Sequence, residues 1–212
     1  MLNYDLLLDS TRPFSDTQNM NPGRPKTTSA GVLRSFHTGR EEQWFVLRAT
    51  YARELKVKAE LEERGVRCFV PMIWRKRTTE GHEEKKLVPA VSSLVFVRWT
   101  REELDAYIRS FGEGRPVNYY WDRTADRPLT VPEKPMEDFI TVASSMDEDL
   151  IYLTEISEKL REGQVVRVKN GPFKGVEGKI VRIKKSRRVM VELPGSLAIA
   201  STFVSPADIE II

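Results

Sequence analysis

Residues 161–178 read Arg-Glu-Gly-Gln-Val-Val-Arg-Val-Lys-Asn-Gly-Pro-Phe-Lys-Gly-Val-Glu-Gly, and this stretch decides the fold of the C-terminal part of the chain. An alternating apolar strand runs into a tight turn, an aromatic residue follows the turn, and glycines recur at short spacing. Such a pattern is typical of a very small β-barrel whose strands bend sharply, because glycine tolerates positive φ. The residues that carry the pattern are Gly163, Gly171, Pro172, Phe173, Gly175 and Gly178.

The segment 159–212 is therefore predicted to form a small five-stranded, SH3-like β-barrel. The expected strands lie at about 164–169, 176–184, 187–193, 197–204 and 208–212. β-Branched residues are dense here, and the glycines and prolines named above are costly inside a helix. We therefore expect the segment to be a constitutive barrel and not a helical structure.

The charge of the chain is modest overall but uneven. The chain has 212 residues, a suitable length for two small domains, and a formal net charge of +3. Basic residues crowd between Lys159 and Arg188, where the only acidic residues are Glu162 and Glu177. This local excess suits contact with a phosphate backbone or with an acidic protein surface.

Several features predict a cytoplasmic protein. Cys68 is the single cysteine, so no internal disulfide can form. No apolar run approaches the roughly 20 residues needed to span a bilayer, and the first residues lack the basic start of a signal peptide. Residues 1–40 are rich in Ser, Thr, Asn, Pro and Gly and are predicted to be a flexible tail; a start codon assigned too far upstream is the alternative.

The block 41–146 is predicted to be an α+β domain in which helices pack on one antiparallel sheet. A polar, charged segment, 75–86, is predicted to be the loop or tip of a long hairpin, and 147–158 a linker. The apolar residues of the first helix allow two buried edges, Ala52/Leu55/Ala59 or Val57/Leu61, and periodicity does not decide between them. The expected strands are 44–49, 66–74 with an edge or bend at Pro71, 87–97 and 117–121. The expected helices are 51–64, ended by Gly65, then 100–108, with Thr100 as the N-cap, and 133–146.

The strand that ends at Val97 has two apolar faces. Alternation places Leu94 and Phe96 on one face and Val95 and Val97 on the other, so one pair must leave the helix-covered side. An antiparallel sheet usually keeps one face in water, so a second apolar face indicates a partner surface. The alternative is that Leu94 and Phe96 are simply core residues.

Taken together, the two blocks resemble the NusG-type transcription elongation factors, with their N-terminal domain (NGN) followed by a KOW domain. Three features, the Trp44 strand, the Cys68–Ile73 segment and the long charged loop, make the chain most similar to specialised members of the RfaH and UpxY type. The pieces that carry the resemblance of the N-terminal block are Gln43–Leu47, Leu61–Gly65, Cys68–Ile73 and Ser93–Val97, and the KOW domain is matched by 161–212.

The resemblance implies a transcription antitermination or elongation factor that binds the clamp helices of RNA polymerase and suppresses pausing or termination, on long polysaccharide (capsule) operons. It implies a monomer that also contacts non-template DNA or nascent RNA. For each candidate DNA contact, solvated surface charge is the alternative. The positions that match the polymerase-binding face are Arg48, Val91, Ser92, Leu94 and Phe96, and the candidate DNA contacts are Arg53, Lys56 and Arg115.

The sequence offers no residues for catalysis or for a cofactor. One cysteine and two distant histidines, His37 and His82, cannot form a zinc site, and no Ser-His-acid or Cys-His arrangement is present. We therefore predict a factor and not an enzyme. The alternative function is an RNA- or ribosome-binding KOW protein without polymerase contact, although the loop 193–196 lacks the aromatic residue by which the housekeeping family member holds a ribosomal protein.

Overall fold

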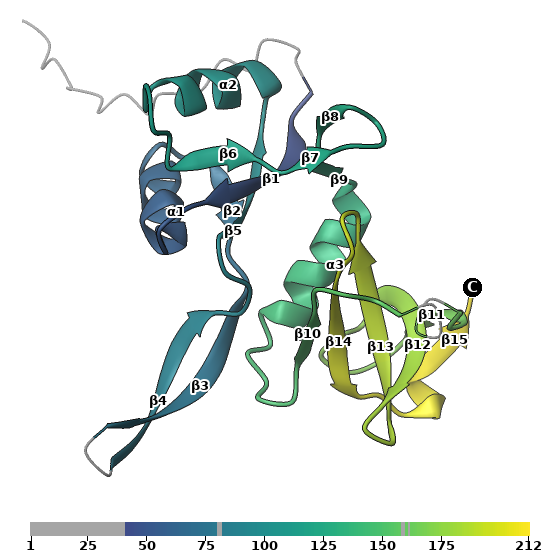
Figure 1. Cartoon of the computed structure of the whole chain (residues 1–212). Helices are drawn as coiled ribbons and strands as arrows, with labels where there is room; N and C mark the ends of the chain where they lie inside the picture. The colour runs from purple at the N-terminus through teal and green to yellow at the C-terminus, as the bar shows by residue number, and fades with distance from the viewer. Residues whose placement is uncertain (1–40, 80–81, 158–159, 161) are drawn as a thin grey trace, which may run out of the picture. The chain divides into compact units, whose positions relative to one another are not determined.

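The computed structural model describes residues 41–79, 82–157, 160 and 162–212 (Figure 1). The tail predicted for residues 1–40 lies outside the described residues. From residue 41 onward the described chain forms one compact unit with an N-terminal α+β part and a C-terminal, strand-rich part. The predicted α+β class is confirmed.

The N-terminal sheet is antiparallel throughout. Its strands follow the order β2-β5-β1-β6, and β9 also pairs with β1. Five of the seven residues of β1 are buried, because β1 and β5 are central strands. The bounds are β1 Gln43–Ala49, β2 Arg67–Phe69, β5 Leu94–Trp99, β6 Val117–Tyr119 and β9 Thr130–Val131.

Three helices accompany this sheet: α1 (Glu54–Glu63), α2 (Arg101–Arg109) and α3 (Glu133–Ala143). The predicted caps are confirmed. The Thr100 hydroxyl accepts a hydrogen bond from the Glu103 amide at the start of α2, and Gly65, at φ +75°, follows the end of α1.

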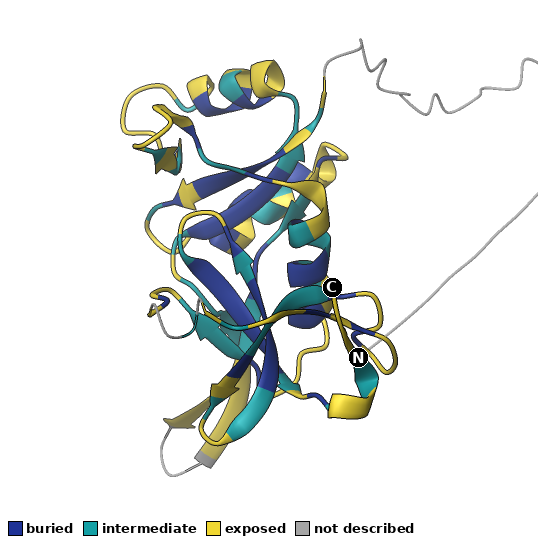
Figure 2. Ribbon diagram, turned by 90° about the vertical axis from the view of Figure 1, so that its right-hand side faces the viewer, coloured by how far each residue is buried: buried dark blue, intermediate teal, exposed yellow. Residues whose placement is uncertain are grey.

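The N-terminal sheet has an apolar core on each face. On the first face, Leu47, Val95 and Val97 pack with residues of α1 and α2, among them Val57 and Leu61. This decides the open question about α1, because Leu55 is exposed and Val57 and Leu61 are buried. The second face packs with α3 (Figure 2); the buried residues that the sheet contributes to this core are Trp44, Val46, Leu94, Phe96 and Val131.

The predicted interruption at Pro71 is confirmed, but the two long predicted strands, 66–74 and 87–97, are each divided between two sheets. Pro71 has no amide hydrogen and ends β2, and the chain then enters β3 (Met72–Thr79), which pairs only with β4 (His82–Pro89). The predicted 87–97 strand is likewise split between β4 and β5. Most of the predicted charged loop, 75–86, is therefore strand, because a two-stranded ribbon exposed on both faces accepts polar residues. The fourth predicted strand also divides, since β7 (Trp121–Asp122) pairs with β8 (Arg127–Pro128).

The C-terminal sheet contains the five predicted strands and one more. Its order is β10-β14-β13-β12-β11-β15. The added strand, β10, comes from residues predicted to be linker, and its apolar residues Ile151, Tyr152 and Leu153 pair with the edge of β14. The bounds are β10 Ile151–Leu153, β11 Val165–Val168, β12 Glu177–Ile183, β13 Ser186–Leu193, β14 Leu197–Phe203 and β15 Ile209–Ile211, with a short 3₁₀-helix at Pro206–Asp208.

The glycines of the 161–178 stretch serve two different purposes. Gly171 and Gly175 have φ +85° and +87°, as the predicted turn requires. Gly163 and Gly178 instead allow close approach of the backbone, because a Cβ atom at either would lie 2.4 Å from a carbonyl oxygen of the neighbouring strand. Phe173 is buried, whereas Pro172 is exposed. None of the described helices is both long and apolar enough to cross a membrane.

Candidate functional site

The residues predicted for the polymerase-binding face lie together on the second face of the N-terminal sheet. Arg48 of β1 is directly opposite Leu94 of β5, and the next pair on this face is Val46 with Phe96. Arg48 is exposed, whereas Leu94 and Phe96 are 5% and 1% exposed. Half-buried Val91 and exposed Ser92 precede β5. The face is therefore polar at one end and apolar along its length.

A buried carboxylate fixes the turn that carries Val91 and Ser92. Ser93 has φ +63°, and its carbonyl oxygen accepts a hydrogen bond of 3.0 Å from the Ala49 amide. The Ser93 amide donates to the Glu54 carboxylate, which is only 4% exposed. Sequence reasoning missed Glu54, which the sequence pattern places among the charges of a solvated helix.

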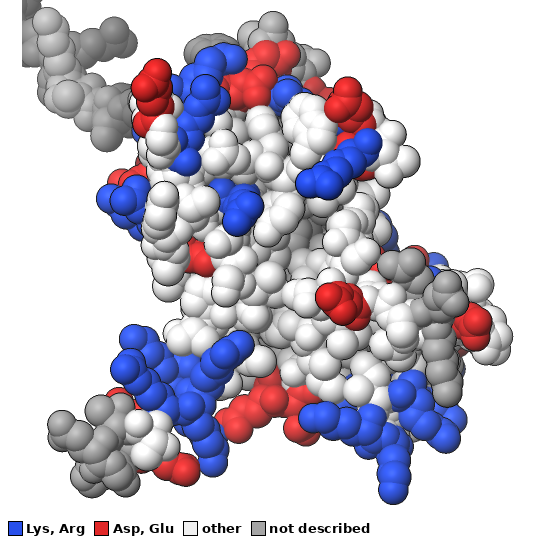
Figure 3. Space-filling view, viewed as in Figure 1, with Lys and Arg blue, Asp and Glu red and all other residues white. Residues whose placement is uncertain are grey.

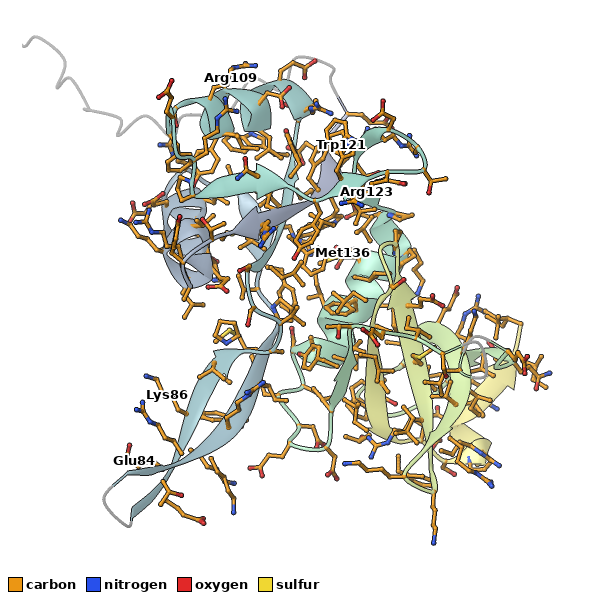
Figure 4. All side chains as sticks on the ribbon, in the orientation of Figure 1. Glu84, Lys86, Arg109, Trp121, Arg123 and Met136 are labelled. Atoms are coloured by element: carbon orange, nitrogen blue, oxygen red, sulfur yellow. The ribbon has the colours of Figure 1, made fainter. Side chains whose placement is uncertain are left out.

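Aromatic contacts fasten α3 to the second face. Phe139 lies 5.7 Å, between ring centroids, from Phe96 and 6.4 Å from Phe69. On its other side Phe139 is 6.3 Å from Tyr152 of β10. Met136, labelled on α3 in Figure 4, is fully buried in the same cluster. The helix α3 is thus covered on both sides.

The turn between β13 and β14 covers the rest of the second face. A cavity of about 200 Å³ lies between them. The turn lies close to Leu129 of the N-terminal part, since a Cβ atom at Gly195 would lie 2.7 Å from Leu129 Cδ2. The residues that line the cavity are Val46, Val91, Leu94, Phe96, Tyr120 and Leu129 of the N-terminal part and Thr154, Pro194, Gly195 and Leu197 of the C-terminal part.

Asp138 of α3 joins the two parts of the described unit. Its carboxylate accepts hydrogen bonds from Lys134 Nζ at 2.6 and 2.7 Å and from the Glu177 amide at 3.2 Å. Lys134 also donates to the carbonyl oxygen of Gly175 at 2.9 Å. A second link comes from Tyr152, whose hydroxyl donates to the Met72 carbonyl oxygen at 3.1 Å and whose pKa burial raises to about 12.

The structure brings together two of the segments predicted to contact DNA. Arg53 precedes α1 and Arg115 lies in the loop before β6, and both are exposed. Thr50 connects their segments, because its amide and its hydroxyl both donate to the Pro116 carbonyl oxygen, at 2.8 and 3.1 Å. Lys56 is exposed on the first turn of α1 and pairs with Glu60 at 3.9 Å. These cations share one edge of the sheet.

Sequence reasoning missed an aromatic residue at this edge. Tyr51 is 82% exposed and has φ +60°, which is unusual for a bulky residue. The Arg53 guanidinium lies 5.9 Å from its ring centroid. An exposed ring beside cations is the arrangement that stacks a nucleobase. The sequence did contain a signal for this contact, because Tyr51 follows the first strand and lies two residues before Arg53.

The cations of the predicted hairpin loop lie instead on its arms. Arg75 is opposite Lys86, and Lys76 is opposite Lys85. Lys76 pairs with Glu83 at 3.3 Å, and Lys85 pairs with the Glu148 carboxylate. Figure 3 shows these blue side chains as one patch on the hairpin.

No group of three or more His, Cys, Asp and Glu side chains suited to a metal ion occurs among the described residues. Cys68 is half-buried, and burial, with a smaller effect of Glu62, raises the pKa of its thiol to about 11. The thiol is therefore protonated near neutral pH and is a poor nucleophile.

Comparison with known proteins identifies two modules. Residues 42–140 match the family model described as transcription termination factor NusG, and residues 162–192 match the KOW motif. The solved structure described as "Domain interaction in Thermotoga maritima NusG" is similar at 20% identity, with a TM-score of 0.41, and covers 81% of this chain and 98% of that chain. A search of curated proteins found no match.

Proposed function

Because the chain belongs to the NusG family of transcription factors, we propose that it binds the clamp helices of RNA polymerase through the second face of its N-terminal sheet. The proposed contact residues are Arg48, Val91, Ser92, Leu94 and Phe96. The proposed effect is suppression of pausing or termination, in the manner of the specialised members that act on long polysaccharide operons. The protein would then act as a binding factor and not as an enzyme.

One observation carries the proposal: the second face is apolar beyond the area that α3 fills. Leu94, Val91 and Val46 border a cavity of about 200 Å³ beside the packed core. An apolar surface that its own helix does not fill is suited to a partner helix. Exposed Arg48 at the end of this face would provide a polar rim.

The same geometry implies competition between polymerase and the C-terminal sheet. The β13–β14 turn lies over the residues that polymerase would use, with Pro194 and Gly195 on the cavity wall. A helix of the partner cannot occupy the face while this turn is in place. We therefore propose that binding displaces the C-terminal sheet from α3.

The test is binding of the full-length chain to core RNA polymerase. Val91 is half-buried and Arg48 is exposed, so the double variant Arg48→Glu, Val91→Asp changes the face without removing a core residue. A charge in an apolar contact costs several kcal/mol, so we expect a loss of binding of at least tenfold. Leu55→Asp is the matched control, because Leu55 is an exposed apolar residue of α1 on the opposite side of the sheet.

Normal binding by the folded double variant would refute the proposed face. If the wild-type chain bound RNA or ribosomes and did not bind core polymerase, the alternative function, an RNA- or ribosome-binding KOW protein, would replace it. Circular dichroism of each variant confirms that the fold is intact.

A further inference from the structure

The turn between β12 and β13 has an unusual composition. Ile183 pairs with Ser186, so Lys184 and Lys185 alone form the two-residue turn. Both have positive φ, +50° and +65°. Two-residue turns with positive φ at both positions favour Asn-Gly or Gly-Gly, since other residues are strained there. Two lysines at this place suggest that their side chains have a role outside the fold.

The turn belongs to a cluster of unpaired cations. Arg182 and Arg187 are directly opposite each other on β12 and β13, a pairing of like charges that destabilises a sheet. With Lys184 and Lys185 they form what we call the hairpin-tip surface. Within the described part of the chain, none of these four side chains makes a salt bridge.

Neighbouring cations of the same sheet are paired. Lys179 contacts Glu192 at 3.4 Å, and Arg167 contacts Glu177 at 2.8 Å. These two cations have carboxylate partners, whereas no acidic residue lines the hollow at the hairpin tip. Figure 3 shows the tip as a group of blue side chains at the lower right, separated by red side chains from the β3–β4 hairpin.

An exposed aromatic ring completes this surface. Phe203, at the end of β14, is 62% exposed, although phenylalanine has no polar atom that would favour exposure. It lines an open hollow of about 450 Å³ together with the four cations, Ser186 and Pro206. None of these lining residues is acidic. The hollow thus combines positive charge with one flat apolar ring.

We propose that the hairpin-tip surface binds single-stranded nucleic acid. Lysine and arginine side chains contact consecutive phosphates, and an unpaired base stacks on Phe203. A duplex would use the cations but could not present an unpaired base to the ring. An acidic peptide would likewise use the charges and leave the ring without a role. The site does not depend on the polymerase-binding face, so it stands whether or not that proposal holds.

The experiment measures binding of the full-length chain to fluorescent oligouridylate and oligothymidylate of 12 nucleotides, and to a blunt duplex, over a range of salt concentrations. Phe203→Leu keeps an apolar side chain and removes the aromatic face, and we expect affinity to fall at least about fivefold with an unchanged salt slope. Lys184→Gln, Lys185→Gln is expected to reduce the slope of log K against log salt by about 1.4, since each single-strand phosphate contact contributes about 0.7.

Matched controls are Trp121→Ala and Arg109→Gln, an exposed aromatic residue and an exposed cation of the N-terminal part (Figure 4). Both are expected to bind as the wild type does. Equal affinity for the blunt duplex, or an acidic peptide that competes while Phe203→Leu has no effect, would overturn the proposal. So would an unchanged salt slope in the lysine variant. The relative affinity for the two oligonucleotides identifies RNA or DNA as the preferred strand.

Discussion

Replacing Asp138 by Ala is expected to release the C-terminal sheet from α3 and to increase affinity for RNA polymerase. The Asp138 side chain is 8% exposed and accepts a hydrogen bond from the Glu177 amide at 3.2 Å. Hydrogen bonds to charged groups contribute about 1.5–3 kcal/mol. Lys134, the other partner, lies on the same helix, so its i,i+4 ion pair is present in both docked and undocked forms and does not contribute to the difference between them.

The loss of the Glu177 hydrogen bond, taken as about 2 kcal/mol, corresponds to a shift of roughly 30-fold between docked and undocked forms. The apparent dissociation constant equals the intrinsic constant divided by the fraction of molecules able to bind. If the docked form dominates, the Asp138→Ala variant should therefore bind core polymerase up to about 30-fold more tightly. Polymerase affinity is measured by fluorescence anisotropy, and undocking by hydrogen exchange of the Glu177 amide.

Asp105→Ala is the matched control. Asp105 also forms an i,i+4 ion pair, with Arg101 at 3.0 Å, and accepts a hydrogen bond from the Tyr119 hydroxyl at 2.8 Å. It lies on α2, however, and its partners both belong to the N-terminal part. It should lower stability and leave polymerase affinity unchanged. Faster exchange of the Glu177 amide in Asp138→Ala without tighter binding would show that the C-terminal sheet does not compete with polymerase. Unchanged exchange would show that Asp138 does not hold the two parts together.

Three further predictions concern stability and reactivity. Gly178→Ala should lower the free energy of unfolding by about 1–3 kcal/mol, because the added Cβ atom would lie 2.4 Å from a backbone oxygen. Gly65→Ala should cost about 1 kcal/mol, because its site is open and only its positive φ is unfavourable. Urea titration compares the two variants. Glu54→Ala should cost about 1–3 kcal/mol by leaving the Ser93 amide unpaired, with thermal unfolding as the measurement. The Cys68 thiol, with its pKa raised to about 11, should react slowly with iodoacetamide at pH 8 and faster as pH rises toward 11, and a plateau reached below pH 9 would contradict this.

Local patterns in the sequence were sufficient for most of the secondary structure. The Thr100 cap, the Gly65 terminus and the five strands of the C-terminal sheet each depend on residues close together in the chain, and each is confirmed. Errors arose where the formation of a strand depends on the strand with which it pairs. Residues 151–153 look like linker until β14 supplies hydrogen bonds, and charged residues 75–86 look like loop until the two arms pair with each other.

The candidate sites show the same division. Alternation alone placed Leu94 and Phe96 on one face, and the register with Val46 and Arg48 agrees. It could not identify Phe203 as exposed, because in sequence the residue ends an apolar strand like any core phenylalanine. Its exposure depends on the position of the strand end beside the β12–β13 turn.

The composition of α3 held a signal that was available and unused. A helix that covers one sheet needs a single apolar stripe. Here Met136, Phe139, Val142 and Ala143 are all buried, and so is the carboxylate of Asp138 among them. A buried carboxylate requires donors, and the helix itself supplies only Lys134. A charged residue within a wide apolar arc therefore indicates a second surface that offers backbone amides, and the start of β12 provides one. The two parts also share one apolar core, in which Trp44 and Phe96 cluster with Leu193 and Ile199 around α3, so undocking must expose apolar surface as well as break these polar contacts.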